Sequence, residues 1–393
     1  MRILIGLCFT LTVTVSAAQS TTPKKDAKSA DPAPKQGIKT PGIQIPFASV
    51  KAEVELPLAP RWIVFSDSIL IPNKTGGLER LDAKTNKLVD PVVGFSNLCG
   101  GSATGFTSLW IPSCETHSLM RLDAKIAADP KAPPPRQGRG PRGPAAEGEA
   151  KPADTKPGDE KPVDPKPAES KPIEGKGARE PVKLAEPAKI DSGIGSAVPA
   201  VAANADSIWI LSDDKTTLSR VDPDQNKVVS ELRLPAGCNT LTFGETDLWV
   251  TCPSENRVLR INPETTLVEK RIEVSPDPTA LAIGEASLWV LCLKEGKIER
   301  IDPKTSKVTK TIETGISGAT AGGIAIGQGS IWVTLTGFPI TRIDPSSEKV
   351  AQQFWGPGGG AIQFGQGSLW LTNLELGTLW RLDPKRILAT LAE

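Results

Sequence analysis

The stretch SLWVLCLKEGKIERIDPKTSKV, residues 287–308, contains a pattern that recurs along the chain. A Ser-Leu-Trp-Val run is followed by a polar loop, then by Arg-Ile-Asp-Pro and a Lys-Val pair. Recurrences at a fixed interval indicate a fold built from similar units rather than two or three unrelated domains. Each copy has an anchor position, which is tryptophan in six copies and leucine in the seventh. The anchors are Leu70, Trp110, Trp209, Trp249, Trp289, Trp332 and Trp370.

The spacing of the anchors predicts the fold. Successive anchors are 40, 99, 40, 40, 43 and 38 residues apart, so the unit is about 40 residues long and one interval is too long. The unit around Trp289 reads as four short strands, TALAIG, SLWVL, KIERID and KVTKTIE. Small residues dominate the first strand of most units, as expected for strands that converge on an axis. We therefore predict an all-β fold, a closed seven-bladed β-propeller of four-stranded blades at residues 49–393.

Two segments compete for the fourth strand of the last blade. Residues 50–58, VKAEVELPL, resemble an outermost strand such as KVVSELRLP at 227–235. The C-terminal residues 386–393, RILATLAE, follow the third strand of the last unit directly. The residue pattern does not decide between them.

The N-terminal residues are typical of an exported protein. Residues 1–18 combine an early arginine, an apolar run and small residues before a cleavage point, which predicts a signal peptide and a periplasmic or secreted location. Residues 19–48 are rich in proline and lysine and read as a linker. No later run is long enough for a transmembrane segment.

The long interval between anchors falls in the second blade. Residues 127–186 contain repeated Lys-Pro-x-Asp/Glu turns and few apolar side chains, so we predict a disordered insertion between the third and fourth strands of that blade. This segment and the N-terminal linker could contact the cell envelope, or could be neutral spacers.

Five cysteines remain after the predicted signal peptide. Cys99 and Cys238 lie on first strands, 11 residues before their anchors, while Cys114 and Cys252 follow the same anchors by four and three residues. A hairpin between the two strands brings each pair together, so we expect disulfides Cys99–Cys114 and Cys238–Cys252. Cys292 should be free. The alternative is that these residues are small buried thiols.

One arginine recurs beside the Ile/Leu/Val-Asp/Asn element of every unit. Seven such cations could form an anion-binding ring, but their regular recurrence favours a role in packing between blades, with the guanidinium paired to a carboxylate or carbonyl. The anchor tryptophans are interpreted in the same way. The arginines are Arg80, Arg121, Arg220, Arg260, Arg300, Arg342 and Arg381.

Residues that break the repeat indicate where a ligand could bind. Trp355 occupies a place where other units carry Arg or Glu, and Phe338 replaces a polar loop tip. Phe95 precedes the second blade, and Arg61 stands where other first strands carry Gly, Ala or Thr. We predict that these four residues form a site for an apolar or aromatic ligand at the mouth of the central channel; local packing is the alternative. Trp62 aligns with core positions and is interpreted as filling space.

Catalytic candidates are few. His117, the one histidine, lies two residues from Glu115 in a polar loop, and such a pair could act as a general base, although a lone histidine there is usually only solvated. Acidic residues in the loops between second and third strands could bind a cation, but basic residues are interleaved with them. No metal ligand is assigned.

The repeats resemble those of extracytoplasmic seven-bladed propellers with YVTN-type repeats, which overlap with proteins similar to streptogramin B (virginiamycin B) lyase. The resemblance covers all seven units named above by their anchors, about residues 50 to 393, apart from the insertion. For the lyases it implies an activity that depends on histidines and a bound magnesium ion at the channel mouth. This chain has a single histidine, so no catalytic residue is carried over.

The sequence therefore favours an extracytoplasmic binding or scaffold propeller with no evident catalytic constellation. A metal-dependent, ring-opening lyase resembling virginiamycin B lyase and a lactonase-like hydrolase remain as alternatives. No cofactor is predicted, and Mg²⁺ is expected only for the lyase. The expected partner is a small molecule or protein at the channel mouth, and the net charge of +1 argues against nucleic acid.

Overall fold

The computed structural model describes most of the residues that carry the repeat. The unit Met1–Pro34 and the predicted insertion at 127–186 lie outside the described residues, and the propeller belongs to the unit Lys35–Glu393. The described ranges are 36–40, 42–65, 68–73, 77–92, 97–123, 188–191, 200–212 and 216–390.

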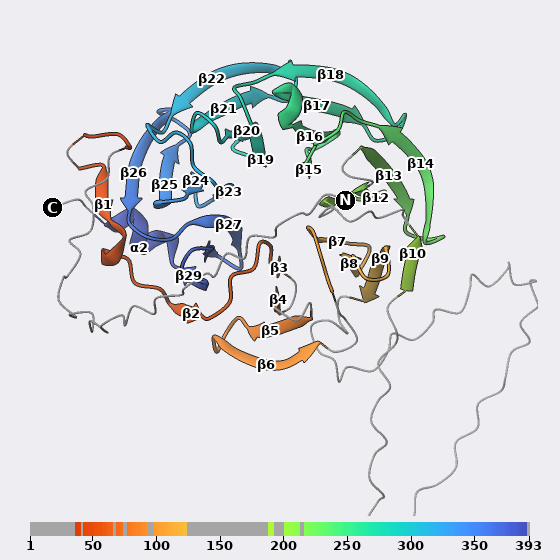
Figure 1. The fold of residues 1–393 in the computed structure, drawn as a ribbon, viewed down its shortest axis with the longest axis horizontal. Helices are drawn as coiled ribbons and strands as arrows, with labels where there is room; N and C mark the ends of the chain where they lie inside the picture. Colours follow the sequence, from red (N-terminus) through yellow and green to blue (C-terminus); the bar gives the residue numbers. More distant parts are fainter. Residues whose placement is uncertain are drawn as a thin grey trace, which may run out of the picture. The chain divides into compact units, whose positions relative to one another are not determined.

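Seven sheets form a ring, with the first strand of each sheet nearest the central channel (Figure 1). Apart from β1 and β2, which come from the N-terminal part of the chain, strands within a sheet are antiparallel neighbours in chain order, which confirms the predicted all-β propeller of seven four-stranded blades. Blade 1 contains β3 (Val64–Phe65), β4 (Ile69–Pro72), β5 (Leu78–Asp82) and β6 (Lys87–Val92). Blade 2 contains β7 (Ala103–Gly105), β8 (Ser108–Ser113), β9 (Ser118–Asp123) and β10 (Ala188–Asp191).

The next three blades repeat this arrangement with short connections. Blade 3 contains β11 (Ala200–Ala203), β12 (Ile208–Ser212), β13 (Thr217–Asp222) and β14 (Lys227–Arg233). Blade 4 contains β15 (Thr240–Phe243), β16 (Leu248–Cys252), the 3-10 turn η2 (Pro253–Glu255), β17 (Arg257–Asn262) and β18 (Leu267–Glu273). Blade 5 contains β19 (Pro278–Gly284), β20 (Ser287–Cys292), β21 (Lys297–Asp302) and β22 (Lys307–Glu313).

The last two blades each take a strand from the N-terminal part of the chain. Blade 6 contains β23 (Gly322–Gly327), β24 (Ser330–Leu335), β25 (Phe338–Asp344) and β26 (Lys349–Trp355), with β1 (Gln44–Pro46) as a fifth strand parallel to β26. Blade 7 contains β27 (Gly360–Gly365), β28 (Ser368–Asn373), β29 (Thr378–Leu382) and β2 (Val54–Leu56).

The N-terminal segment closes the ring. β2 pairs antiparallel with β29, and Leu56 packs in one apolar cluster with Ile63 of blade 1 and Trp370 of blade 7. The C-terminal residues form the helix α2 (Pro384–Ala389) instead of a strand, and the Asp383 side chain accepts a hydrogen bond from the Lys385 N–H at its start. The question that the sequence left open is therefore decided in favour of residues 50–58.

The chain that precedes β2 also packs on the propeller. Residues 36–50, here called the N-terminal arm, include β1 and the 3-10 turn η1 (Phe47–Ser49). Ile45 and Phe47 are 2% and 3% exposed, and Phe47 stacks on Trp380 with ring centroids 4.9 Å apart. The buried Gln353 side chain accepts a hydrogen bond from Ile38 N–H and donates one to the Thr314 carbonyl. Ordered structure thus begins before the boundary predicted at residue 49.

The anchor tryptophans and the recurring arginines face each other across neighbouring strands. Trp110 pairs with Arg121, for example, and its indole lies 4.8 Å from the guanidinium carbon. The arginine heads then reach the next blade: Arg121 donates to the Asn226 side chain at 2.8 Å, and Arg300 forms an ion pair with Glu348 at 2.8 Å. These contacts lie near the turns between third and fourth strands, and they agree with the packing interpretation.

Those turns are stabilised by an aspartate at the end of the third strand. The Asp302 carboxylate accepts hydrogen bonds from the Lys304 N–H at 2.8 Å and from Thr305. Backbone hydrogen bonds, that from Lys304 first, hold the pKa of Asp302 below its ordinary value. Blade 4 has Asn262 at this position, and its side-chain oxygen accepts the same two backbone bonds.

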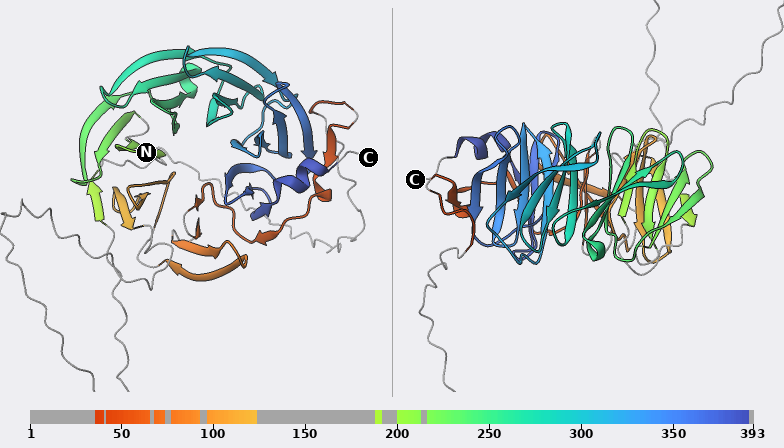
Figure 2. Two further views of the ribbon diagram at one scale, coloured as in Figure 1. Left: turned by 180° about the vertical axis from the view of Figure 1, so that it is seen from behind. Right: turned by 90° about the horizontal axis from the view of Figure 1, so that it is seen from above.

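The strands run between two faces of the propeller (Figure 2). First strands begin at one face, which we call the channel mouth; the turns between second and third strands lie at the same face. The opposite face, with the tryptophan–arginine contacts and the turns between third and fourth strands, is called the repeat end. No helix among the described residues has both the length and the apolar character needed to cross a membrane.

Candidate functional site

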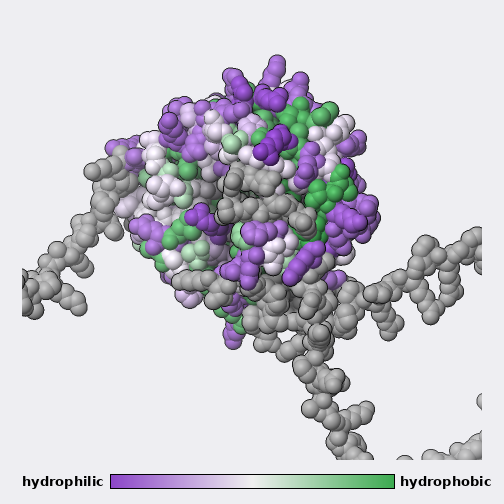
Figure 3. Space-filling model, turned by 45° about the vertical axis from the view of Figure 1, so that its right-hand side comes forward, coloured by the Kyte–Doolittle hydropathy of each residue, from purple (hydrophilic) through white to green (hydrophobic). Residues whose placement is uncertain are grey.

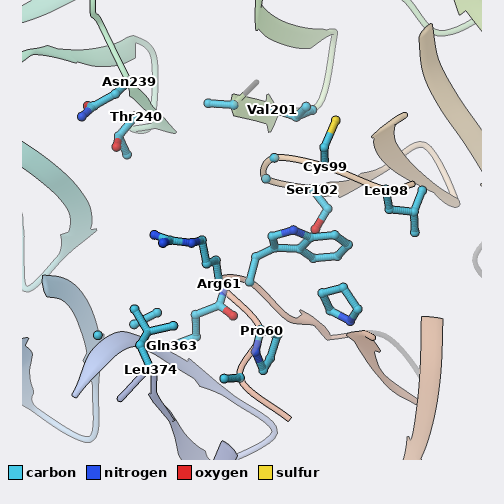
Figure 4. A pocket seen from close by; sticks show the side chains of 18 of the residues that line it. Pro60, Arg61, Leu98, Cys99, Ser102, Val201, Asn239, Thr240, Gln363 and Leu374 are labelled. Atoms are coloured by element: carbon cyan, nitrogen blue, oxygen red, sulfur yellow. The ribbon is translucent and has the colours of Figure 1, made fainter. Parts of the chain in front are cut away.

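A cavity of about 790 Å³ occupies the channel mouth (Figure 4). Every blade contributes to its lining, mostly through the residues at or just before the start of the first strand. The cavity is wide because many of its lining residues are small. They include Gly101, Ala200, Thr240, Gly322 and Ala361. The volume is within the range typical of small-molecule sites, roughly 300–1,000 Å³.

Arg61 is the one charged side chain among the described residues of this lining. It is exposed, and it follows Pro60 just before β3. Among the described residues it has no ion pair or hydrogen bond, unlike Arg121, Arg300 and Arg381 of the repeat end. Figure 4 shows its side chain extending into the cavity between the strands that carry Thr240 and Gln363. An unpaired guanidinium in such a place is available to a ligand.

Neutral polar groups surround the arginine. The Asn239 side-chain oxygen accepts a hydrogen bond from the Thr251 hydroxyl at 2.5 Å, which leaves its amide N–H groups for other partners. Thr240 donates to the Thr279 carbonyl at 2.7 Å. Gln363 differs, because its side-chain oxygen Oε1 is buried and has no hydrogen-bond partner among the described residues. A buried acceptor without a partner is costly, and because this atom is shielded from solvent, a molecule in the cavity does not reach it in this side-chain conformation.

Trp62 has a second role that the sequence interpretation missed. It packs partly on the apolar cluster of blades 1 and 2, as expected for a space-filling residue, and it also lines the cavity next to Arg61. Its position in the only blade whose anchor is not tryptophan is what suggested space filling. Nothing in the repeat pattern indicates which side of the indole faces the channel.

Two disulfides stabilise the channel mouth. Cys99 is bonded to Cys114 and Cys238 to Cys252, the two pairs expected from the sequence. Each links the segment before a first strand to the end of the second strand, and Cys99 lines the cavity. Cys292 is a free, buried thiol that faces Pro278 in the corresponding pair of strands, and burial raises its pKa.

The predicted aromatic site residues are distributed differently. Phe338 is 5% exposed and belongs to the core cluster of blades 5 and 6, where Trp355 packs half-buried at the end of β26. Neither residue lines the cavity, and both lie beside the N-terminal arm. A Cβ atom on Gly37 of the arm would come within 2.9 Å of the Phe338 ring, so the arm covers this ring closely. Phe95 lies outside the described residues.

His117 and Glu115 lie in an exposed turn between β8 and β9. His117 has a left-handed backbone conformation with φ of 50°, and the corresponding turns of blades 4 and 5 have Asn256 and Gly296 in that conformation. The position therefore selects residue types that tolerate positive φ, histidine included. Glu115 accepts a hydrogen bond from Asn97 at 3.3 Å. Neither residue lines the cavity.

The described residues also lack a grouping suited to metal binding. No three His, Cys, Asp or Glu side chains among them converge on a common point. The residues of the cavity lining that the structure describes include neither a carboxylate nor an imidazole.

Comparisons with known proteins agree on the fold. No family model matches the chain, and no curated protein matches it in sequence. A solved structure described as a streptogramin B lyase is similar over 83% of this chain and 94% of its own, with a TM-score of 0.58 and 16% identity. Hydrazine synthase from Kuenenia stuttgartiensis is similar over 44% of this chain and 54% of its own, with a TM-score of 0.40 and 15% identity. The first likeness shows that this chain shares the lyase's propeller fold, and fold alone does not assign an activity.

Proposed function

We propose that the protein is a non-catalytic extracytoplasmic binding propeller whose ligand site is the cavity at the channel mouth. The observation that carries the proposal is the lining of that cavity: one unpaired cation, Arg61, among neutral polar and apolar groups. General acid–base chemistry needs an acid or base beside the ligand, and Arg61 is the one charged side chain among the described lining residues. The two disulfides suggest an oxidising compartment, in keeping with a periplasmic or secreted protein.

A small molecule fits this site better than an apolar protein partner. The surface seen in Figure 3 is mainly hydrophilic, with apolar groups in small areas. Large apolar side chains that are exposed lie singly or in pairs on different blades, which is ordinary for a protein surface. They are Leu88, Val89, Val229, Leu267 and Leu376. The concave cavity is the surface with the size and chemistry of a ligand site.

A binding screen on the full chain tests the proposal. The probes are a panel of organic acids, amino acids, sugars and aromatic compounds, measured by isothermal titration calorimetry, with recovery of each bound compound by mass spectrometry. We expect at least one class to bind with one-to-one stoichiometry and to be recovered unchanged. Binding should be lost in Ala361→Trp, which fills the cavity, and in Ala200→Phe, which narrows it from another blade.

The control places the same bulk elsewhere. Leu267→Trp on the outer strand β18, at a side chain that is 60% exposed, should bind as the parent does. Far-ultraviolet circular dichroism shows whether each cavity variant is folded. Binding that survives both cavity variants would refute the site. Conversion of a bound compound, or magnesium-dependent turnover of a streptogramin or lactone that is abolished in His117→Ala, would refute the non-catalytic assignment.

A further inference from the structure

The charge balance of the cavity indicates what kind of ligand it takes. Six blades have a small, neutral residue where blade 1 has Arg61, so the propeller does not need a long cationic side chain at this position. Several arginines of the repeat end are used by the scaffold; Arg381, for instance, donates hydrogen bonds to Ser368 and Ala83 and forms an ion pair with Glu53. Arg61 has no such contact among the described residues, although it reaches into a concave space lined by uncharged groups.

A guanidinium recognises an anion. It presents paired N–H donors in one plane, which match the two oxygens of a carboxylate, and a charge-assisted pair is about twice as strong as a neutral hydrogen bond. A phosphate ester carries up to two negative charges, which one arginine does not balance. The single charge of the lining is therefore matched to a monocarboxylate.

A further feature of the lining describes the rest of the ligand. Leu58, Leu98, Leu374 and Trp62 supply apolar surface, against which an aliphatic or aromatic body can pack.

From these observations we propose that the cavity binds a small organic monocarboxylate with an apolar body. Arg61 pairs with the carboxylate. The proposal rests on the proposed function, because it names the ligand class of the same site.

Matched pairs of probes test this ligand class on the full chain. The probes are phenylacetate and mandelate, their neutral amides, and inorganic phosphate, each titrated calorimetrically to about 10 mM, which detects millimolar affinity. We expect each acid to bind at least about tenfold more tightly than its amide, as one charged hydrogen-bonded pair provides. Phosphate should bind more weakly than either acid.

Variants assign the effects to residues. Arg61→Gln should abolish the preference for acid over amide, and Arg61→Lys should retain part of it. The matched control is Arg257→Gln, which removes an arginine from the same face that already pairs with Glu255 and Glu273, and which should change none of these ratios.

Some results would refute the ligand class and leave the cavity as a binding site, and another would refute both proposals. If no acid binds, if acid and amide bind alike, or if phosphate binds most tightly, the ligand is not a monocarboxylate. An amide that binds as tightly as its acid, and is lost in Ala361→Trp, would refute the charge assignment while supporting a binding site in the cavity. Acid binding that survives Ala361→Trp and Ala200→Phe would refute both proposals.

Discussion

The two ends of the propeller differ in how strictly the blades repeat. At the repeat end, a tryptophan lies opposite an arginine in the same register in one blade after another. An aspartate or asparagine also recurs in the adjoining turn and accepts hydrogen bonds from the turn backbone. At the channel mouth, the corresponding positions differ between blades, and Arg61 is charged where the others are small. The difference separates residues that the fold requires from residues that it does not require. Residues of the second kind are free to bind a ligand.

The largest effect on stability is expected at the repeat end. Trp289→Ala removes a fully buried indole that packs between blades 5 and 6, and it should lower the free energy of unfolding by about 3–5 kcal/mol. Trp62→Ala at the channel mouth, which removes a half-buried indole, should cost clearly less. Urea unfolding of the two variants measures both. Equal losses would contradict the distinction between the two ends.

The disulfides give the channel mouth its own stabilisation. Cys99→Ser with Cys114→Ser opens a loop of 15 residues and should lower stability by about 3 kcal/mol. Because Cys99 lines the cavity, the same variant should also weaken ligand binding. Alkylation before and after reduction, followed by mass spectrometry, checks the pairing. In the native, unreduced protein none of the five cysteines from Cys99 to Cys292 should react, since four are disulfide-bonded and Cys292 is buried with a raised pKa. Rapid modification of several cysteines would contradict the assignment.

The sequence predicted the repeating features best. The spacing of Trp249 and Trp289 is local information, and so is the position of Cys238 before Trp249, because each depends on residues within one blade. Ring closure is different. Residues 50–58 had to be compared with a rival segment, because β2 pairs with a strand more than 300 residues away, and three residues are too few for a clear strand pattern.

The candidate site was predicted only in part for the same reason. Trp355 and Phe338 were recognised as departures from the repeat. In the structure both pack in one cluster with Ile38 of the N-terminal arm. The Ile38 N–H also donates a hydrogen bond to Gln353, which is 315 residues away in the sequence. Arg61 was recognised by the same reasoning and does line the cavity. A departure from a repeat shows that a residue has a special neighbour, and only the three-dimensional structure shows whether that neighbour is protein or open space.

The arm should make a smaller contribution than either the indole or the disulfide. Gln353→Ala leaves the Ile38 N–H and the Thr314 carbonyl without their partner in a buried place, so a loss of about 2 kcal/mol is expected. Gln363→Ala, at an amide whose oxygen has no partner, is the matched control and should cost little. Thermal melting of both variants is the measurement. A destabilisation of Gln363→Ala as large as that of Gln353→Ala would show that the cavity amide is structural.

The smallest effect concerns acid stability at the repeat end. Since the pKa of Asp302 is lowered in the folded state, its contribution is present above the unfolded value of 3.8 and is lost as the pH falls through the folded value. Asp302→Asn keeps the turn, as Asn262 does in blade 4, but it does not titrate. Its melting temperature should match the parent at pH 7 and decline less below pH 4. A parallel decline would show that the carboxylate is not responsible.

The division between scaffold and site is tested most directly by comparing two arginines in urea unfolding, with and without mandelate. Arg381→Gln removes a side chain with an ion pair, several hydrogen bonds and an indole contact, and it should lose about 2 kcal/mol while mandelate still stabilises it. Arg61→Gln should stay within about 0.5 kcal/mol of the parent and gain nothing from mandelate. If Arg61→Gln is instead destabilised as much as Arg381→Gln, or is stabilised by mandelate as the parent is, Arg61 belongs to the scaffold and the division is wrong.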